Sequence, residues 1–103
     1  MVVARGEVWW GETADEKGRP FLVVSRDAAN ETMRRVLVAP VTTRVRGLPS
    51  ELAVGAAEGL PVASVASFDN IRPFPKAMLV RRLGSLGPRQ HEICRTAGAT
   101  LDC

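Results

Sequence analysis

The sequence lacks the residues from which several common active sites are built. It has a single histidine, His91, and only two cysteines, Cys94 and Cys103. A lone histidine so late in the chain disfavours a Ser-His-Asp triad, and the three residues lack the spacing of a metal site. Neither of the common glycine-rich phosphate loops is present. We therefore predict no metal site and no cofactor, and we interpret His91 as a surface residue rather than a catalytic imidazole.

Long apolar segments are also missing. No apolar run has the length that a bilayer span requires, and the first five residues are too short for the apolar stretch of a signal peptide. We therefore expect a cytoplasmic protein with no membrane contact. A single possible cysteine pair is not a disulfide framework, so we expect a small apolar side chain and a free thiol near a frayed end.

What the sequence does have is an arginine-rich basic charge on a chain of domain size. Its 103 residues fit one compact domain, residues 1–103, and the net charge is +3. Twelve of the fourteen basic residues are arginine, which makes bidentate contacts with phosphate and stacks on bases. A genome of high GC content would give the same excess, and composition alone does not separate the two explanations.

Short strand-like runs separated by turn signals dominate the chain. We expect strands over residues 7–11, 20–25, 35–43, 51–54, 62–69 and 78–86. Pro40 lies inside the third of these strands and cannot donate to a ladder, so the strand should bulge, bend or lie at an edge there. Residues 72–75, Arg-Pro-Phe-Pro, are expected to break the strand pattern, and Asp27 is interpreted as the N-cap of a helical turn.

One helix is expected, at the C-terminal end. Pro88 suits its first position, and Ile93, Ala97 and Leu101 recur at four-residue spacing as one apolar stripe. Six or seven short strands with one helix predict a mainly β fold, a small barrel or sandwich, in which the helix covers an open face of the sheet.

Three polar motifs adjoin these strands. In the first, Pro20 fixes the backbone after Arg19, so the guanidinium is held at the rim of the core, as a phosphate clamp requires. In the second, Thr42 ends a buried strand, where its hydroxyl can bond a phosphate oxygen. In the third, Asp69 follows a strand beside Asn70, as a general base or a partner for Arg19. Taken singly, each has a simpler interpretation: a surface arginine, a threonine that favours strands, and the cap of a turn.

Taken together and in order, the motifs resemble the MazF/PemK family of toxins, from about Arg5 to the end of the chain. The stretches that carry the resemblance are Arg-Gly-Glu-Val-Trp at 5–9, Arg-Pro-Phe-Leu-Val-Val-Ser at 19–25, Val-Ala-Pro-Val-Thr at 38–42 and Asp-Asn-Ile-Arg at 69–72. The resemblance implies an SH3-like barrel, a homodimer, and sequence-specific, metal-independent cleavage of single-stranded RNA. It also implies an antitoxin whose disordered tail lies along the RNA site.

The family's active-site residues carry over in part. The arginine before proline and the threonine after proline-aliphatic correspond to Arg19 and Thr42, and the aspartate of the plasmid branch corresponds to Asp69. That branch also has an arginine where this chain has Ser67, and a histidine in the first loop, where this chain has Asp15 and Glu16. For the RNA strand itself we expect contacts from the following residues: Arg44, Arg46, Asn70, Arg72 and Glu16.

Metal-free RNA cleavage needs a base for the 2′-OH, positive charge on the phosphorane and a donor for the 5′-oxygen. We interpret Arg19 as the clamp and acid, with Asp69, Asp15 or Glu16 as the base, because a guanidinium is a poor base. Trp9 or Trp10 could stack a base, although both suit the core. The rival interpretations are a CcdB-like toxin that poisons gyrase without catalysis, and a non-catalytic RNA-binding module.

Overall fold

The computed structural model describes residues 2–15 and 17–98, and it is mainly β with a helix at the end. The strands of these residues are β1 (Glu7–Gly11), β2 (Arg19–Val23), β3 (Arg35–Thr42), β4 (Glu51–Val54), β5 (Ser64–Ser67), β6 (Arg72–Pro75) and β7 (Leu79–Ser85). The helices are α1 (Asp27–Thr32) and α2 (Glu92–Ala97), with short 3-10 helices η1 (Ala56–Glu58), η2 (Phe68–Asn70), η3 (Lys76–Met78) and η4 (Gly87–His91).

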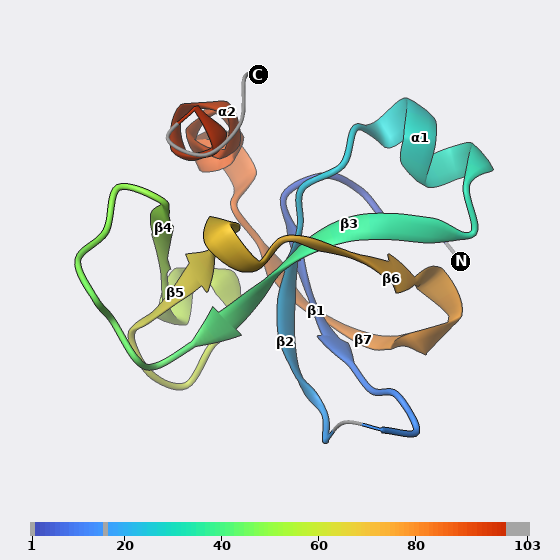
Figure 1. Cartoon of the computed structure of the whole chain (residues 1–103), viewed down its shortest axis with the longest axis horizontal. Helices are drawn as coiled ribbons and strands as arrows, with labels where there is room; N and C mark the ends of the chain where they lie inside the picture. Colours follow the sequence, from blue (N-terminus) through green and yellow to red (C-terminus); the bar gives the residue numbers. More distant parts are fainter. Residues whose placement is uncertain (1, 16, 99–103) are drawn as a thin grey trace.

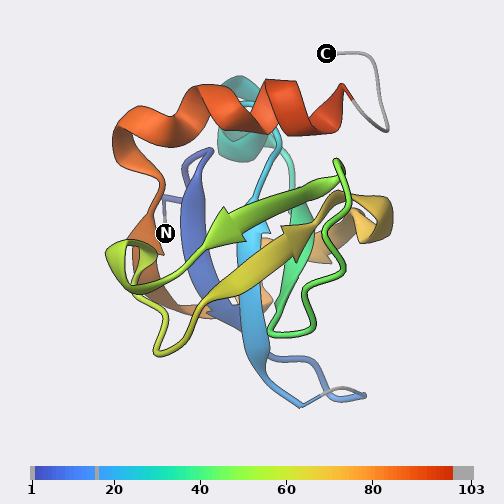
Figure 2. The same cartoon turned by 90° about the vertical axis from the view of Figure 1, so that its left-hand side faces the viewer.

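The strands form one curled antiparallel sheet. Its order is β4-β5-β3-β2-β1-β7, and β6 pairs with β3 outside this path (Figure 1). The curl brings β6 and β7 around one side, while β4 and β5 fold over the other. α2 lies across the top of the molecule above β4 and β5 (Figure 2). The expected small barrel with a C-terminal helix is confirmed.

Pro40 lies where β3 changes its partner. β6 pairs with residues 35–38 of β3, and β5 pairs with residues 41–42. On its other edge β3 pairs with β2, where Phe21 lies opposite Pro40. A residue without an N–H suits the gap between two partners, because no ladder bond is required of it there. The expected irregularity at Pro40 therefore takes the form of this change of partner.

Two apolar cores lie on opposite faces of the central strands. Successive residues of a strand point to opposite faces, so Val8 enters one core and Trp9 the other, and both are buried. The first core is closed by α2 through Ile93, which is 1% exposed. The second contains Phe21 and Phe74, whose rings lie 4.6 Å apart.

Several local expectations are corrected. Residues 72–75 form β6 rather than a break, because two prolines are tolerated in a strand that pairs on one side only. The N-cap of α1 is Arg26, and Asp27 instead accepts a hydrogen bond from the backbone N–H of Arg5, at 2.6 Å. The expected strand over 62–69 is β5 followed by η2.

The C-terminal expectations are tested only in part. Cys94 is disulfide-bonded rather than a free thiol. Leu101 of the expected apolar stripe and Cys103 lie outside the described residues, whereas Ile93 and Ala97 are both buried as expected. His91 is exposed at the end of η4, as expected of a surface residue. No helix in residues 2–15 and 17–98 has the length and apolar character to cross a membrane.

Candidate active site

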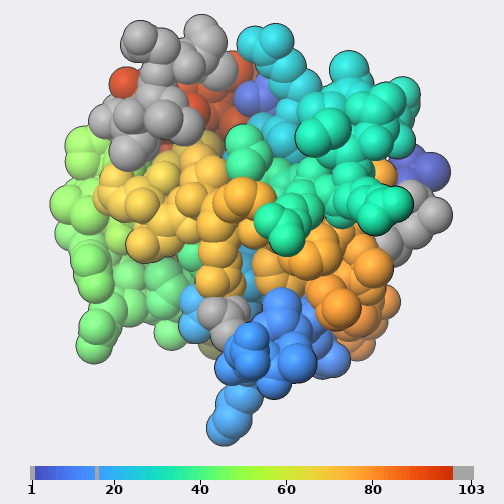
Figure 3. Space-filling view, turned by 45° about the vertical axis from the view of Figure 1, so that its right-hand side comes forward, coloured from blue at the N-terminus to red at the C-terminus, as the bar shows by residue number. Residues whose placement is uncertain are grey.

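The three polar motifs meet in one groove made of two adjoining hollows, of about 570 and 340 Å³. The hollows share Arg19, Pro40 and Asn70. Figure 3 shows the contributing segments on one face: the β1–β2 loop in blue, the β3–β4 loop in green and the segment after β5 in gold. The first hollow also has Lys17, Gly18 and Arg72; the second has Thr42, Arg44, Arg46, Leu48, Glu51, Ser67 and Asp69.

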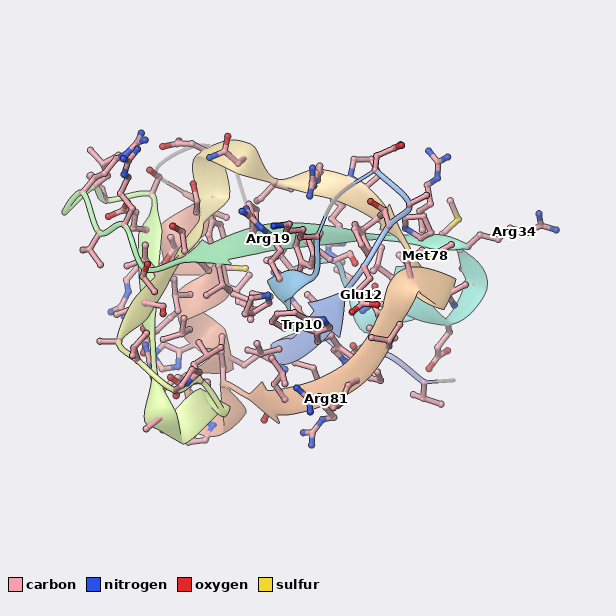
Figure 4. The ribbon with its side chains drawn as sticks, turned by 90° about the horizontal axis from the view of Figure 1, so that it is seen from below. Trp10, Glu12, Arg19, Arg34, Met78 and Arg81 are labelled. Atoms are coloured by element: carbon pink, nitrogen blue, oxygen red, sulfur yellow. The ribbon has the colours of Figure 1, made fainter. Side chains whose placement is uncertain are left out.

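Arg19 begins β2 and lines both hollows. Its side chain is exposed, and within the described part of the chain its guanidinium has no hydrogen bond or ion pair. Trp10 supports the backbone on both sides of Arg19, because Gly18 packs on the ring of Trp10 and Pro20 pairs with Trp10 in the β1–β2 register. In Figure 4, Arg19 lies toward β3 and Trp10 toward β7. The cation is therefore available on a fixed base.

Thr42 ends β3 and lines the second hollow together with Arg19. The β2–β3 register pairs Phe21 with Pro40, and continuing it by two residues places Arg19 opposite Thr42. The hydroxyl oxygen of Thr42 accepts a hydrogen bond from the backbone N–H of Arg44, at 3.1 Å. Because that bond uses the oxygen as an acceptor, the hydroxyl hydrogen remains available to a ligand in the groove.

Asp69 lies in η2, directly after β5, and its carboxylate reaches the second hollow. The hydroxyl of Ser50 donates to its Oδ2 at 2.6 Å. Ser50 is 6% exposed and its carbonyl accepts the backbone N–H of Phe68, at 2.9 Å, so the donor is itself fixed. Phe68 itself is buried in the first core. Asp69 thus lines the second hollow with one carboxylate oxygen, Oδ2, held by a hydrogen bond from a fixed donor.

Arg72 occupies the other hollow, at the edge of the second core. Its guanidinium carbon lies 5.3 Å from the ring centroid of Phe21 and 6.0 Å from that of Phe74. A guanidinium this close to aromatic rings is held by cation–π attraction while its N–H groups remain donors. Beside it, the amide of Asn70 donates to Ser67 Oγ at 2.9 Å. Arg72 therefore places a fixed positive charge next to Lys17 and Arg19.

The β3–β4 loop carries two more exposed arginines, Arg44 and Arg46, along the rim of the second hollow. The carboxylate of Glu51 accepts hydrogen bonds from the backbone N–H groups of Arg46, at 3.0 and 3.2 Å, and of Leu48, at 3.1 Å. The loop is thus fastened to the start of β4 by one side chain.

The structure brings together nearly all of the residues that the sequence singled out. Those in the second hollow are Arg19, Thr42, Asp69, Arg44, Arg46 and Asn70; Arg72 lies in the adjoining one. Glu16 lies outside the described residues, and Asp15 does not line either hollow. Sequence reasoning missed Lys17, Ser50 and Glu51, although Ser-Glu directly after Pro49 marks polar side chains at the beginning of a strand.

The groove is rich in positive charge. Among the described residues, five cations line it, namely Lys17, Arg19, Arg44, Arg46 and Arg72, against the two carboxylates of Glu51 and Asp69. Each of these two carboxylates accepts a hydrogen bond from the protein. In residues 2–15 and 17–98, no three His, Cys, Asp or Glu side chains gather as metal ligands would. The arrangement fits a polyanion whose phosphate lies between Arg19 and Thr42.

Comparison with known proteins identifies the family of this chain. The family model described as the PemK-like, MazF-like toxin of type II toxin-antitoxin systems matches residues 4–97. The chain is 44% identical over 102 residues to the probable endoribonuclease MazF5 of Mycobacterium tuberculosis, covering 97% of this chain and 94% of that protein. It is 40% identical over 101 residues to the probable endoribonuclease MazF2 of the same species, covering 96% and 98%.

Solved structures give the same result. The Mycobacterium tuberculosis toxin MazF-mt6 superposes with a TM-score of 0.80 at 34% identity, covering 94% of this chain and 99% of that one. A mycobacterial endoribonuclease in complex with its cognate antitoxin also superposes with a TM-score of 0.80, at 28% identity, covering 95% and 94%. The chain therefore belongs to the family of PemK-like, MazF-like toxins of type II toxin–antitoxin systems.

Proposed function

We propose that this toxin is a sequence-specific, metal-independent endoribonuclease that cuts single-stranded RNA in the groove between β2, β3 and η2. The observation that carries the proposal is the meeting of Arg19, Thr42 and Asp69, from three separate elements, in one hollow. Relatives described as endoribonucleases align with nearly the whole chain, which supports the same activity here.

In this mechanism a base takes the proton from a ribose 2′-OH, and the 2′-oxygen then attacks the adjacent phosphorus. Asp69 is the candidate base, since it lines the same hollow as Arg19 and Thr42 and Ser50 fixes one of its carboxylate oxygens. The bond from phosphorus to the 5′-oxygen breaks, and the leaving oxygen receives a proton. The products are a 2′,3′-cyclic phosphate and a 5′-OH.

Arg19 and Thr42 act on the phosphate. The guanidinium of Arg19 offers two aligned donors to the oxygens that gain charge in the phosphorane. Arg19 is also the candidate acid, which gives a proton to the leaving 5′-oxygen. The hydroxyl of Thr42 adds a neutral donor opposite it. Arg44, Arg46 and Arg72 bind the flanking backbone phosphates, which orients the strand without reading its bases.

The protein acts as a homodimer in the cytoplasm, where its RNA substrate is found, and is held inactive by a cognate antitoxin. Solved structures of a mycobacterial relative with its cognate antitoxin, and of MazE-MazF from Deinococcus radiodurans, support such a partner. A disordered antitoxin tail that carries carboxylates would satisfy the five cations of the groove in place of RNA.

The test is incubation of the purified protein with single-stranded RNA in the presence of EDTA. We expect cleavage to continue, and the ends to be 2′,3′-cyclic phosphate and 5′-OH. Arg19→Ala should lower the rate by roughly 10²- to 10³-fold. Arg34→Ala is the matched control, because it removes the same charge just before β3, at the end of that strand remote from Thr42. Intact RNA at high protein concentration would instead favour a binding protein.

A further inference from the structure

Glu51 is an acidic residue in a groove that we assign to a polyanion. It lines the same hollow as Arg44 and Arg46, so its charge alone opposes the binding of a phosphate backbone. Its contacts point to a different role. Both carboxylate oxygens accept backbone N–H groups of the β3–β4 loop, and the backbone N–H of Glu51 donates to the carbonyl of Leu48 at 3.0 Å.

These hydrogen bonds hold a loop that has no buried side chains to fix it. Residues 43–49 are all exposed, and the two apolar side chains among them, Val45 and Leu48, are 58% and 41% exposed. A loop without buried side chains takes its conformation from hydrogen bonds, and bonds to a carboxylate are the strongest that a backbone N–H makes. At its other end, the loop is fixed where the N–H of Arg44 bonds the Thr42 hydroxyl.

We propose that Glu51 is a positioning residue: it fastens the β3–β4 loop so that Arg44 and Arg46 face the phosphates of an RNA strand in the groove. The inference rests on the proposed function, since it assumes that RNA occupies the groove. Glu51 does not touch the reacting atoms in this scheme. It acts through the backbone of Arg46 and Leu48, and its favourable effect on loop order exceeds its repulsion of the phosphates.

The direction in which RNA binding changes separates the two roles of Glu51, positioning of the loop and repulsion of phosphates. A short single-stranded oligonucleotide with 2′-O-methyl groups is the probe, because a blocked 2′-OH prevents cleavage while the phosphates remain. We expect Glu51→Gln to weaken its binding, measured by fluorescence anisotropy, by roughly five- to twentyfold, a range typical of losing aligned phosphate contacts. Equal or tighter binding would overturn the proposal, because it would leave only the repulsive role.

The control variant is Glu31→Gln, which removes the same charge from an exposed position on α1. It should leave binding unchanged or make it slightly tighter. With unmodified RNA, Glu51→Gln should raise KM and change kcat by less than about twofold, since the chemical groups are left in place. A fall in kcat with unchanged KM would contradict a positioning role. A rise in KM would also contradict it if thermal unfolding showed that the variant had lost its fold.

A double-mutant cycle tests the route through the arginines. In the Arg44→Ala, Arg46→Ala background the loop has no cation left to position, so Glu51→Gln should no longer weaken binding. A loss that persists there would overturn the route. If the two arginine variants bind the probe as tightly as the unchanged protein, the RNA path of the proposed function fails. If they bind weakly and Glu51→Gln does not, only the inference about Glu51 fails; an unchanged protein that does not bind the probe refutes both.

Discussion

Gly18 packs directly on the ring of Trp10: a Cβ at residue 18 would lie 2.3 Å from Trp10 Nε1 and 2.5 Å from Cε2. The indole N–H donates to Glu12 Oε2 at 2.9 Å, which holds the ring in place (Figure 4). Gly18 also precedes Arg19, the proposed phosphate clamp. Trp10, which was expected to stack a base or fill the core, therefore supports the loop that presents this cation, whereas Trp9 is buried in the second core.

Gly18→Ala should damage both the fold and the activity. The added methyl group cannot fit between the backbone and the indole, so either the ring or the start of β2 must move. We expect the free energy of unfolding to fall by about 1–3 kcal/mol, the usual effect of overpacking, and RNA cleavage to fall because Arg19 is displaced. Urea unfolding and initial cleavage rates measure the two effects.

Two further variants show whether the contact with Trp10 is the cause. In Gly18→Ala combined with Trp10→Leu, the smaller side chain leaves room for the methyl group, so much of the lost stability should return. Gly55→Ala is the matched control, because a Cβ there meets nothing closer than the Cα of Ala63, at 3.8 Å. If Gly55→Ala is as harmful as Gly18→Ala, the steric explanation is wrong.

Thr42→Val removes the hydroxyl and keeps the shape of the side chain. Because the phosphate loses a donor and the N–H of Arg44 loses its acceptor, we expect the cleavage rate to fall by on the order of 10²-fold. Thr42→Ser restores the hydroxyl and should recover most of the rate. A valine variant that cleaves at the full rate would remove Thr42 from the mechanism; circular dichroism should show the same fold in all three proteins.

Asp69→Asn separates the acid-base role from the structural one. Asparagine can still accept the hydrogen bond from Ser50 through its amide oxygen, so the fold and RNA binding should persist. The cleavage rate should fall by roughly 10²- to 10⁴-fold if the carboxylate takes the 2′-OH proton. Full activity in this variant would assign the base elsewhere in the groove.

Arg89 joins η4 to the buried carboxylate of Glu58. Its Nη1 lies 3.3 Å from Glu58 Oε2, and its Nη2 donates to the carbonyl of Ala53 at 2.8 Å. Arg89→Met keeps the apolar stem but leaves Glu58, whose side chain is 4% exposed, without its cation. We expect the free energy of unfolding to fall by about 1–3 kcal/mol, the cost of an unsatisfied buried polar group. An unchanged unfolding midpoint in urea would refute this.

The ion pair of Arg89 with Glu92 predicts a loss of stability in acid. The hydrogen bond from Arg89 lowers the pKa of Glu92 below its ordinary value of 4.5, and the positive charge of Arg89 lowers it as well. A carboxylate with a lowered pKa stabilises the fold above 4.5 and loses that contribution as the pH falls through its folded pKa. Glu92→Gln should therefore flatten the decline of the free energy of unfolding below pH 4.5, whereas Glu31→Gln should not.

Most of the fold could be predicted from the sequence because its strands are short apolar runs between turn residues. The bounds of β1 and β4 agree with those expected, and β3 differs by one residue at its end. β6 was not predicted because, in the sequence alone, proline indicates a break in a strand. Whether a strand lies at an edge is a property of the assembled sheet, and only there do Pro73 and Pro75 become acceptable.

The sequence predicted the residues of the candidate site that belong to a short motif. It did not predict those that depend on contacts between residues far apart in the chain. Arg19, Thr42 and Asp69 each belong to a recognisable short motif. The partners that orient them do not: Ser50 lies 19 residues from Asp69, and Gly18 meets Trp10 across a loop. Arg72 was expected simply to bind phosphate, and its stacking on Phe21 and Phe74 follows only from the curl of the sheet.

The change of strand partner at Pro40 has one more consequence, because Pro40 also forms the surface shared by the two hollows. A proline there presents no N–H to an anion in the groove. The groups that can bind an entering strand therefore come from the elements around Pro40: the start of β2, the end of β3, the loop after β3, η2 and the start of β6. The spacing of these elements then decides how bulky an entering strand can be.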